Sequence, residues 1–430
     1  MLAVLTVSIG LIIFLLVAVE NGRNFLSIAG IVNITFFLGF IVRPLLIIFY
    51  FDGVTYNGLN VADDMQSFVG ILLLAYFLYL FFYFGLLGGR NKISHLNSFS
   101  LDRNQILAIS KLLMITGILG YLSYLYVAGF FDSGITGLFE YIYGDRGFYY
   151  FRSVSFLFIF GFFGILKYGN LGWVAKLLYL VIALAITLSF YARQHFVIFA
   201  VLGLHLYLMG FDPKRAAKFD LKGIMVLIFV FISLSYSMSF LLNARSVFAA
   251  GDEINLVEIG GEQQAPLEYL LNSGQITYFD FGVEIYQDKG FELNHIGRSF
   301  LNLMMTPIPS SLYKDKPKNF NRALAEDSTR KYPSSPAFGY SVEIFYNLSI
   351  LSFLVGPLLM FSIGYWMRKA FNSLNIDGFN YMFYIFIFSS FFLCLRSGLA
   401  PSMASFFEKA VPFLVIVFFY KLVLFRGVIR

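Results

Sequence analysis

Five arginines stand close to strongly apolar stretches of this chain: Arg43, Arg193, Arg245, Arg298 and Arg396. A guanidinium group stays protonated, and its planar fork donates two parallel hydrogen bonds, a geometry that phosphate and diphosphate groups accept. An arginine at membrane depth costs roughly 3 kcal/mol, a cost that a bound anion can offset. The alternative is that each arginine reaches lipid headgroups or pairs with a local acid. The set predicts a phosphate site that needs no metal.

Two further residues could move a proton at such a site. Glu343 lies just before an apolar segment that we expect to begin at residue 345, and a carboxylate there could accept the proton of a hydroxyl group. Its alternative roles are an ion pair with an arginine or the cap of a helix start. His295 is the second candidate base, and its alternative role is that of a polar surface residue.

Three acidic residues, Asp280, Glu284 and Asp288, are spaced to share one face of a helix. They could bind a cation, but we interpret them as a solvated acidic face. Cys394 is the single cysteine, which excludes disulfides within the chain and cysteine-based metal sites. No HExxH, CxxC, P-loop or GxGxxG pattern stands in a usable context, so we expect neither a metal nor a cofactor.

The composition requires a membrane to accommodate these residues. Hydrophobic residues make up 59% of the chain and charged residues only 13%, more apolar surface than a soluble fold could bury. The formal charge of +6 comes from basic residues that are scattered along short loops and not clustered, so we expect no nucleic-acid partner. The positive surplus is better explained by the orientation of the chain in the membrane. We interpret 2–19 as a retained span, because it lacks the basic start of a signal peptide.

Apolar windows predict an all-α integral membrane protein with about eleven transmembrane helices. The expected spans are 2–19, 25–50, 65–89, 105–128, 151–168, 172–190, 194–211, 223–242, 345–367, 381–397 and 409–426.

Lys and Arg predominate in alternate loops, as at Lys214 and Arg215 and at Arg368 and Lys369. The positive-inside rule therefore predicts a cytoplasmic C-terminus, with the N-terminus and the long loop outside.

The spans divide the chain into three parts. Residues 1–242 form an N-terminal bundle of about eight helices, 243–344 a long extracytoplasmic loop, and 345–430 a C-terminal group of about three helices. Within the loop, the apolar spacing of 295–305 predicts a short amphipathic helix that carries Arg298 on its polar face.

This organisation resembles the bacterial oligosaccharide repeat-unit (O-antigen) polymerases, the Wzy family. The resemblance is carried by the many spans, the long loop in the second half, a proline-rich piece and a Gly-x-Ser-x-Glu pattern before a span. Here these pieces are Thr306-Pro307-Ile308-Pro309-Ser310-Ser311-Leu312-Tyr313-Lys314-Asp315-Lys316-Pro317 and Gly339-Tyr340-Ser341-Val342-Glu343.

The resemblance implies a GT-C-like glycosyltransferase of the bacterial inner membrane. It would transfer a growing glycan from undecaprenyl diphosphate to the terminal sugar of a new lipid-linked repeat unit at the extracytoplasmic face. The five arginines would bind the diphosphates and stabilise the leaving group. Glu343 would activate the acceptor hydroxyl, with His295 as second candidate. Tyr340 and Tyr346 could stack against sugar rings. Membrane lipids are further expected partners, and whether a chain-length regulator is also a partner is left open by the sequence.

Three other functions are alternatives to polymerisation. An O-antigen ligase would use the same donor with a lipid A core acceptor. A lipid-linked oligosaccharide flippase is a different class, but such transporters usually show paired halves and broken helices with polar residues at the midplane. The chain has no detectable internal repeat, which disfavours a flippase. A membrane acyltransferase is disfavoured because no histidine pairs with an acid in mid-membrane.

Overall fold

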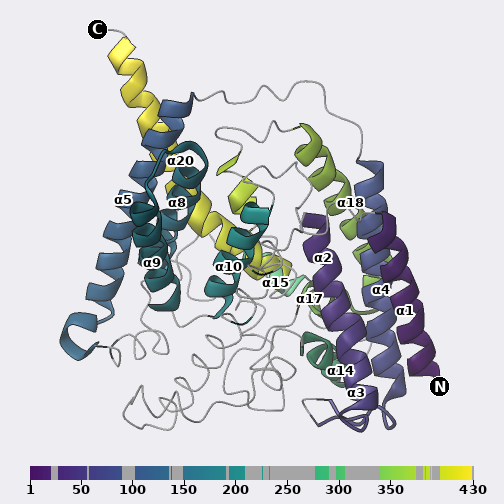
Figure 1. Cartoon of the computed structure of the whole chain (residues 1–430). Helices are drawn as coiled ribbons and strands as arrows, with labels where there is room; N and C mark the ends of the chain where they lie inside the picture. Colours follow the sequence, from purple (N-terminus) through teal and green to yellow (C-terminus); the bar gives the residue numbers. More distant parts are fainter. Residues whose placement is uncertain are drawn as a thin grey trace. The chain divides into compact units, whose positions relative to one another are not determined.

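A computed structural model gives the fold of this protein (Figure 1). The residues that it describes are 1–20, 28–55, 58–89, 102–134, 137, 149–189, 193–208, 225, 232, 277–289, 297–305, 339–373, 381–382, 384–387, 389 and 398–428.

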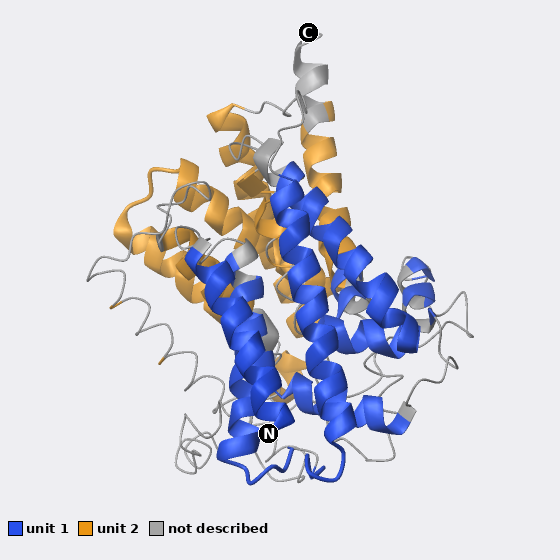
Figure 2. Cartoon of the chain, turned by 90° about the vertical axis from the view of Figure 1, so that its right-hand side faces the viewer, with its two compact units in different colours: residues 1–98, 268–375, 390–404 blue, residues 99–267, 376–389, 405–430 orange. Residues whose placement is uncertain are grey.

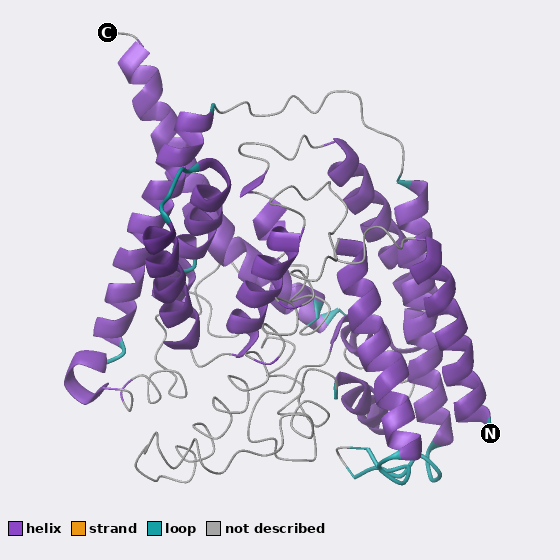
Figure 3. Ribbon diagram, in the orientation of Figure 1, coloured by secondary structure: helices purple, strands orange, loops and turns teal. Residues whose placement is uncertain are grey.

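The described part of the chain is helical and contains no strand, only an isolated bridge between Val54 and Asn60 (Figure 3). Its elements are α1 (Leu2–Glu20), α2 (Ile28–Phe37), the π-helix η1 (Leu38–Val42), α3 (Arg43–Phe49), α4 (Met65–Gly88), α5 (Arg103–Val127), α7 (Tyr149–Ser155), α8 (Leu157–Tyr168), α9 (Trp173–Ser189), α10 (Arg193–Leu208), α14 (Tyr278–Lys289), α15 (Arg298–Met305), α17 (Gly339–Leu348), the 3₁₀ turn η2 (Ser349–Leu351), α18 (Ser352–Ser373) and α20 (Leu399–Val428).

Six described helical segments are long and apolar enough to cross a bilayer. They are Leu2–Val19, Val32–Phe49, Met65–Gly88, Arg103–Val127, Phe151–Tyr168 and Gly339–Lys369. Each overlaps an expected span, so the chain is a multi-pass, all-α membrane protein. The expected spans at 172–190 and 194–211 are the shorter helices α9 and α10, and 409–426 lies within α20. Most of 223–242 and 381–397 lies outside the described residues.

The chain forms two compact units, which Figure 2 colours separately. Unit 1 contains residues 1–98, 268–375 and 390–404, and unit 2 contains 99–267, 376–389 and 405–430. The units group the chain differently from a division into bundle, loop and bundle, because unit 1 includes most of the long polar segment. In unit 1, α4 packs against α1, α2 and α18, while α14 packs against η1, α4 and α17. In unit 2, α5 packs on α7 and α8, and α9 packs on α8 and α10.

Two of the long helices, α4 and α5, begin at capping residues that the sequence supplies. The Asp64 side chain accepts a hydrogen bond of 3.2 Å from the Ser67 N–H at the start of α4. At the start of α5, Asp102 and Gln105 form a reciprocal capping box, with hydrogen bonds of 2.7 and 3.1 Å. These bonds satisfy N–H groups that have no partner within their own helix.

Glycines let the helices approach closely in both units. A Cβ atom on Gly85 of α4 would collide with the Phe361 carbonyl of α18, and one on Gly364 of α18 would collide with the Phe82 carbonyl of α4. In unit 2, a Cβ on Gly117 of α5 would meet the backbone of α8. Helices in lipid associate through such small-residue contacts, because the hydrophobic effect does not draw them together.

The helix pair α4–α18 gives a direct test. We expect Gly364→Ala to lower stability in detergent by on the order of 1–3 kcal/mol, because the added methyl group forces two backbones apart. Gly88→Ala is the matched control at the same helix pair, since its Cβ would stand 3.4 Å from the Tyr365 ring, an ordinary contact. Thermal unfolding of the purified variants measures the difference, and equal midpoints would contradict the close-packing account.

Candidate functional site

Glu343 lies inside helix α17 and is 0% exposed. The helix begins at Gly339, four residues before Glu343, so the apolar helical segment starts earlier than the expected residue 345. The segment 339–369 is also not one continuous α-helix, because Ser349 has a φ of 47° and interrupts it. A left-handed residue cannot continue the i to i−4 hydrogen-bond pattern of a right-handed helix. α17 is therefore a short buried helix that precedes α18.

The carboxylate of Glu343 contacts the beginning of α20. Its Oε2 atom accepts a hydrogen bond from the N–H of Leu399, the first residue of that helix. The preceding residue, Gly398, has a φ of 96°, and a Cβ there would stand 2.6 Å from the same oxygen. A carboxylate at a helix N-terminus satisfies a free N–H and interacts favourably with the helix dipole. Glu343 thus caps a helix, one of the roles expected for it, while its role as a base stays a prediction.

Helix α15 begins beside the end of α17. The N–H of Gly297 donates to the Asn347 carbonyl at 3.2 Å, and the Asn347 side chain donates to the Glu343 carbonyl at 2.8 Å. Arg298 is the first residue of α15, so its backbone lies next to the helix that carries Glu343. The predicted amphipathic helix is confirmed over Arg298–Met305, and its Met304 side chain is 78% exposed.

The two tyrosines expected to stack on sugar rings are buried inside unit 1. Tyr340 is 3% exposed and Tyr346 is 6% exposed. Next to them, the ring of Tyr286 stacks on Phe345 with 4.8 Å between centroids. Burial raises the pKa of the Tyr286 phenol, and the Asp64 carboxylate raises it further. That phenol therefore remains a protonated hydrogen-bond donor at neutral pH.

Arg43 forms a buried ion pair with Asp280. Its Nε donates to Asp280 Oδ1 at 2.9 Å and its Nη2 to Oδ2 at 2.7 Å, while the Phe51 ring centroid lies 5.0 Å from the guanidinium carbon. The side chains are 1% and 0% exposed. The structure thus shows for Arg43 the alternative in which an arginine pairs with an acid of its own chain.

The backbone around Arg43 departs from α-helical geometry. Pro44 has no N–H, so the Phe40 carbonyl loses its usual partner four residues on, and the Arg43 N–H bonds to Leu38 five residues back. The Tyr76 hydroxyl donates to the Phe40 carbonyl at 3.4 Å. The π-helix that results places Arg43 at the start of α3, toward Asp280.

The interpretation of the α14 acids as a solvated face is wrong for two of the three. Asp280 and Glu284 are 0% and 4% exposed, whereas Asp288 is exposed. Helical periodicity places the three on one face, but packing in unit 1 buries its first two turns. The Tyr278 hydroxyl also donates to the Thr35 carbonyl, in space that Gly39 leaves open.

The other arginines are described only in part. Arg193 is the first residue of α10 in unit 2 and Arg298 the first residue of α15 in unit 1. Nothing is described of these two side chains. Arg245, Arg396 and His295 lie outside the described residues. Among the described residues, no group of three His, Cys, Asp or Glu side chains could hold a metal.

Unit 2 contains polar contacts that the sequence reasoning did not find. His205 Nε2 lies 2.6 Å from the Tyr384 hydroxyl, and both side chains are buried. Lys409, in α20, is 4% exposed. The sequence signal for Lys409 was a basic residue inside an apolar helix, a feature that often marks a functional position.

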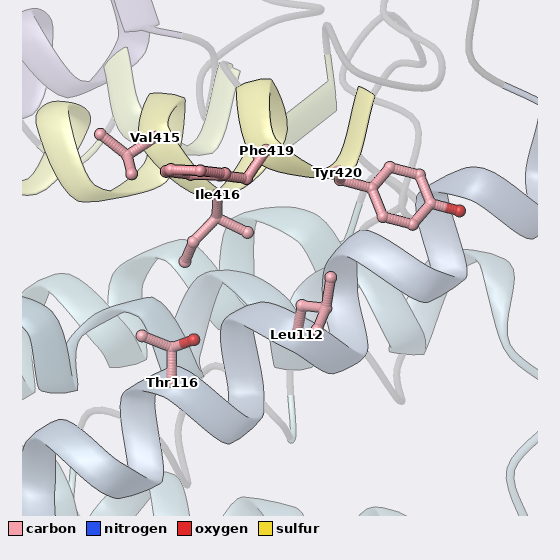
Figure 4. A pocket seen from close by; sticks show the side chains of 6 residues that line it. All are labelled: Leu112, Thr116, Val415, Ile416, Phe419 and Tyr420. Atoms are coloured by element: carbon pink, nitrogen blue, oxygen red, sulfur yellow. The ribbon is translucent and has the colours of Figure 1, made fainter. Parts of the chain in front are cut away.

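The same unit has an apolar groove between α5 and α20, with a volume of about 320 Å³ (Figure 4). It is lined by Leu112, Thr116, Val415, Ile416, Phe419 and Tyr420.

No protein-family model, curated protein or solved structure matches the chain.

The Arg43–Asp280 pair makes a testable contribution to unit 1. We expect Arg43→Met or Asp280→Leu alone to cost about 3–5 kcal/mol, because each leaves one buried charge without a partner. The double variant should recover much of that loss, since it removes both charges. Asp288→Leu, on the exposed end of α14, is the control. Unfolding by denaturing detergent measures all four variants, and additive losses in the double variant would contradict the pairing.

Proposed function

We propose that this protein is a membrane-embedded glycosyltransferase that polymerises lipid-linked oligosaccharide repeat units, as the resemblance to the Wzy polymerases implies. It would act at the extracytoplasmic face of the bacterial inner membrane, with its C-terminus in the cytoplasm. The multi-pass helical fold supports a substrate that itself resides in the bilayer.

One observation carries the proposal: the contact between α15 and α17. It brings the backbone of Arg298, a candidate for phosphate binding, to the helix that holds Glu343, the candidate base. Asn347 follows Glu343 by one helical turn, about 6 Å along the axis, and its carbonyl binds the residue before Arg298. A glycosyl transfer from a diphosphate carrier needs these two functions close together. One stabilises the leaving diphosphate and the other accepts the proton of the attacking hydroxyl.

The arginine set would bind the diphosphates of donor and acceptor in this proposal. Arg298 is the first choice, with Arg193, Arg245 and Arg396 as the further members. Arg43 is the weakest member, because Asp280 already neutralises it within unit 1.

Glu343→Gln separates the base from the cap. The Gln side-chain oxygen can still accept the Leu399 N–H, so we expect the variant to fold, whereas its amide cannot accept a proton. Polymer formation should fall by about 10²-fold or more, the usual contribution of a positioned base. Glu343→Ala should in addition lose stability. Polymer formation is measured as the amount of long-chain glycan on gels from a deletion strain complemented with each variant. Unchanged turnover in Glu343→Gln would remove Glu343 as the base.

Arg298→Ala should abolish polymer while the protein stays inserted, because a leaving diphosphate would lose a cation. Surface glycan would then collapse to single repeat units. Arg103→Ala is the matched control, since Arg103 also begins a helix but is exposed, and its Nε donates to the Tyr168 carbonyl at 2.9 Å. Glycan gels and immunoblots of the membrane fraction check both variants. Full-length polymer in Arg298→Ala would refute this role. Loss of all attached repeats would favour a ligase.

A further inference from the structure

Lys409 is a buried ammonium group in unit 2 without an acidic partner among the described residues. Its Nζ donates to Ser405 Oγ at 2.8 Å and lies 4.7 Å from the centroid of the Phe156 ring. An ammonium group has three N–H donors, and the described part of the chain supplies an acceptor for one of them. A buried cation without a counter-ion is unfavourable, so such a group normally binds an anion or gives up its proton.

The surroundings of Lys409 carry a surplus of positive charge. Arg152 of α7 lies near enough for its charge to act on Lys409, and within the described part of the chain Glu408 is the acid that acts on it. Glu408 is exposed and accepts a hydrogen bond from Ser153 at 3.2 Å. Among the described residues, Lys409 and Arg152 are two cations beside the one carboxylate of Glu408, a balance that favours an anionic ligand.

The apolar groove lies further along α20, and two of its lining residues share the side of the helix that carries Lys409. Ile416 and Tyr420 follow Lys409 by seven and eleven residues, spacings that return to one side of an α-helix. Ile416 is therefore about 10 Å from Lys409 along the axis. The facing wall, Leu112 and Thr116, belongs to α5, a helix apolar enough to lie in hydrocarbon (Figure 4).

We propose that unit 2 binds a phosphate-bearing lipid, with the phosphate at Lys409 and Arg152 and a hydrocarbon chain in the groove between α5 and α20. A cation about 10 Å along one helix face from an apolar groove matches the phosphate and the hydrocarbon chain of such a lipid. This site is built from residues of unit 2, whereas Glu343 and Arg298 belong to unit 1, and it does not require the glycosyltransferase activity.

The test measures lipid binding to the purified full-length protein in neutral detergent by native mass spectrometry. Dioleoyl phosphatidic acid is the probe, and dioleoylglycerol is the matched lipid without phosphate. We expect Lys409→Met to weaken phosphatidic acid binding about tenfold or more, the value of a lost charge-assisted hydrogen bond. Lys409→Arg should keep most of it. Lys369→Met is the control, because Lys369 also contacts a hydroxyl and aromatic rings but is half-buried in α18.

A second arm separates the lipid from free phosphate. Leu112→Trp should fill the groove, weaken phosphatidic acid binding and leave the binding of inorganic phosphate, followed by thermal shift, unchanged. If phosphate binds and Leu112→Trp has no effect on the lipid, the site takes the phosphate alone and the groove assignment fails. Equal binding of the two lipids by the wild type, or unaltered phosphatidic acid binding in Lys409→Met, would overturn the proposal. Neither result depends on polymer formation.

Discussion

A charge buried inside this protein needs a counter-charge, from the protein or from a bound ligand, because neither lipid nor a packed helical core can solvate it. Unit 1 meets this constraint through the bidentate pair of Arg43 and Asp280. That pair ties α14, from the polar second half of the chain, to the start of α3, where the π-helix η1 separates α2 from α3. Without it, the burial of α14 would leave Asp280 without a counter-charge, at a cost of several kcal/mol. The placement of α14 also fixes the surface on which α17 packs.

Helix α17 joins the remaining parts of unit 1. It is too short to span a bilayer, yet Gly339 to Asn347 are all buried. Its Glu343 carboxylate binds the first residue of α20, and its Asn347 carbonyl binds the residue before α15. Short, broken helices are tolerated at membrane depth only where protein or a polar cavity surrounds them. The same helix therefore organises the fold and carries the candidate chemistry.

Part of the candidate site was predictable because its signals are local. The apolar windows gave the positions of the six long helices, and the spacing of apolar residues gave the amphipathic helix that begins at Arg298. The surroundings of Asp280 and Glu343 were harder to predict from the sequence. Each was recognised as a polar residue that could do chemistry, but one was expected in solvent and the other at a membrane rim, and both are buried.

The amino-acid sequence by itself determined that the chain is helical and lies in a membrane, because it carries more apolar side chains than a soluble fold could bury. Only the tertiary structure decided which charges neutralise each other, since Arg43 and Asp280 are 237 positions apart. It likewise placed Glu343 against Leu399 and left Lys409 buried beside an apolar groove. Hydropathy and helical periodicity act over a few turns, whereas ion pairs and caps depend on which helices pack together.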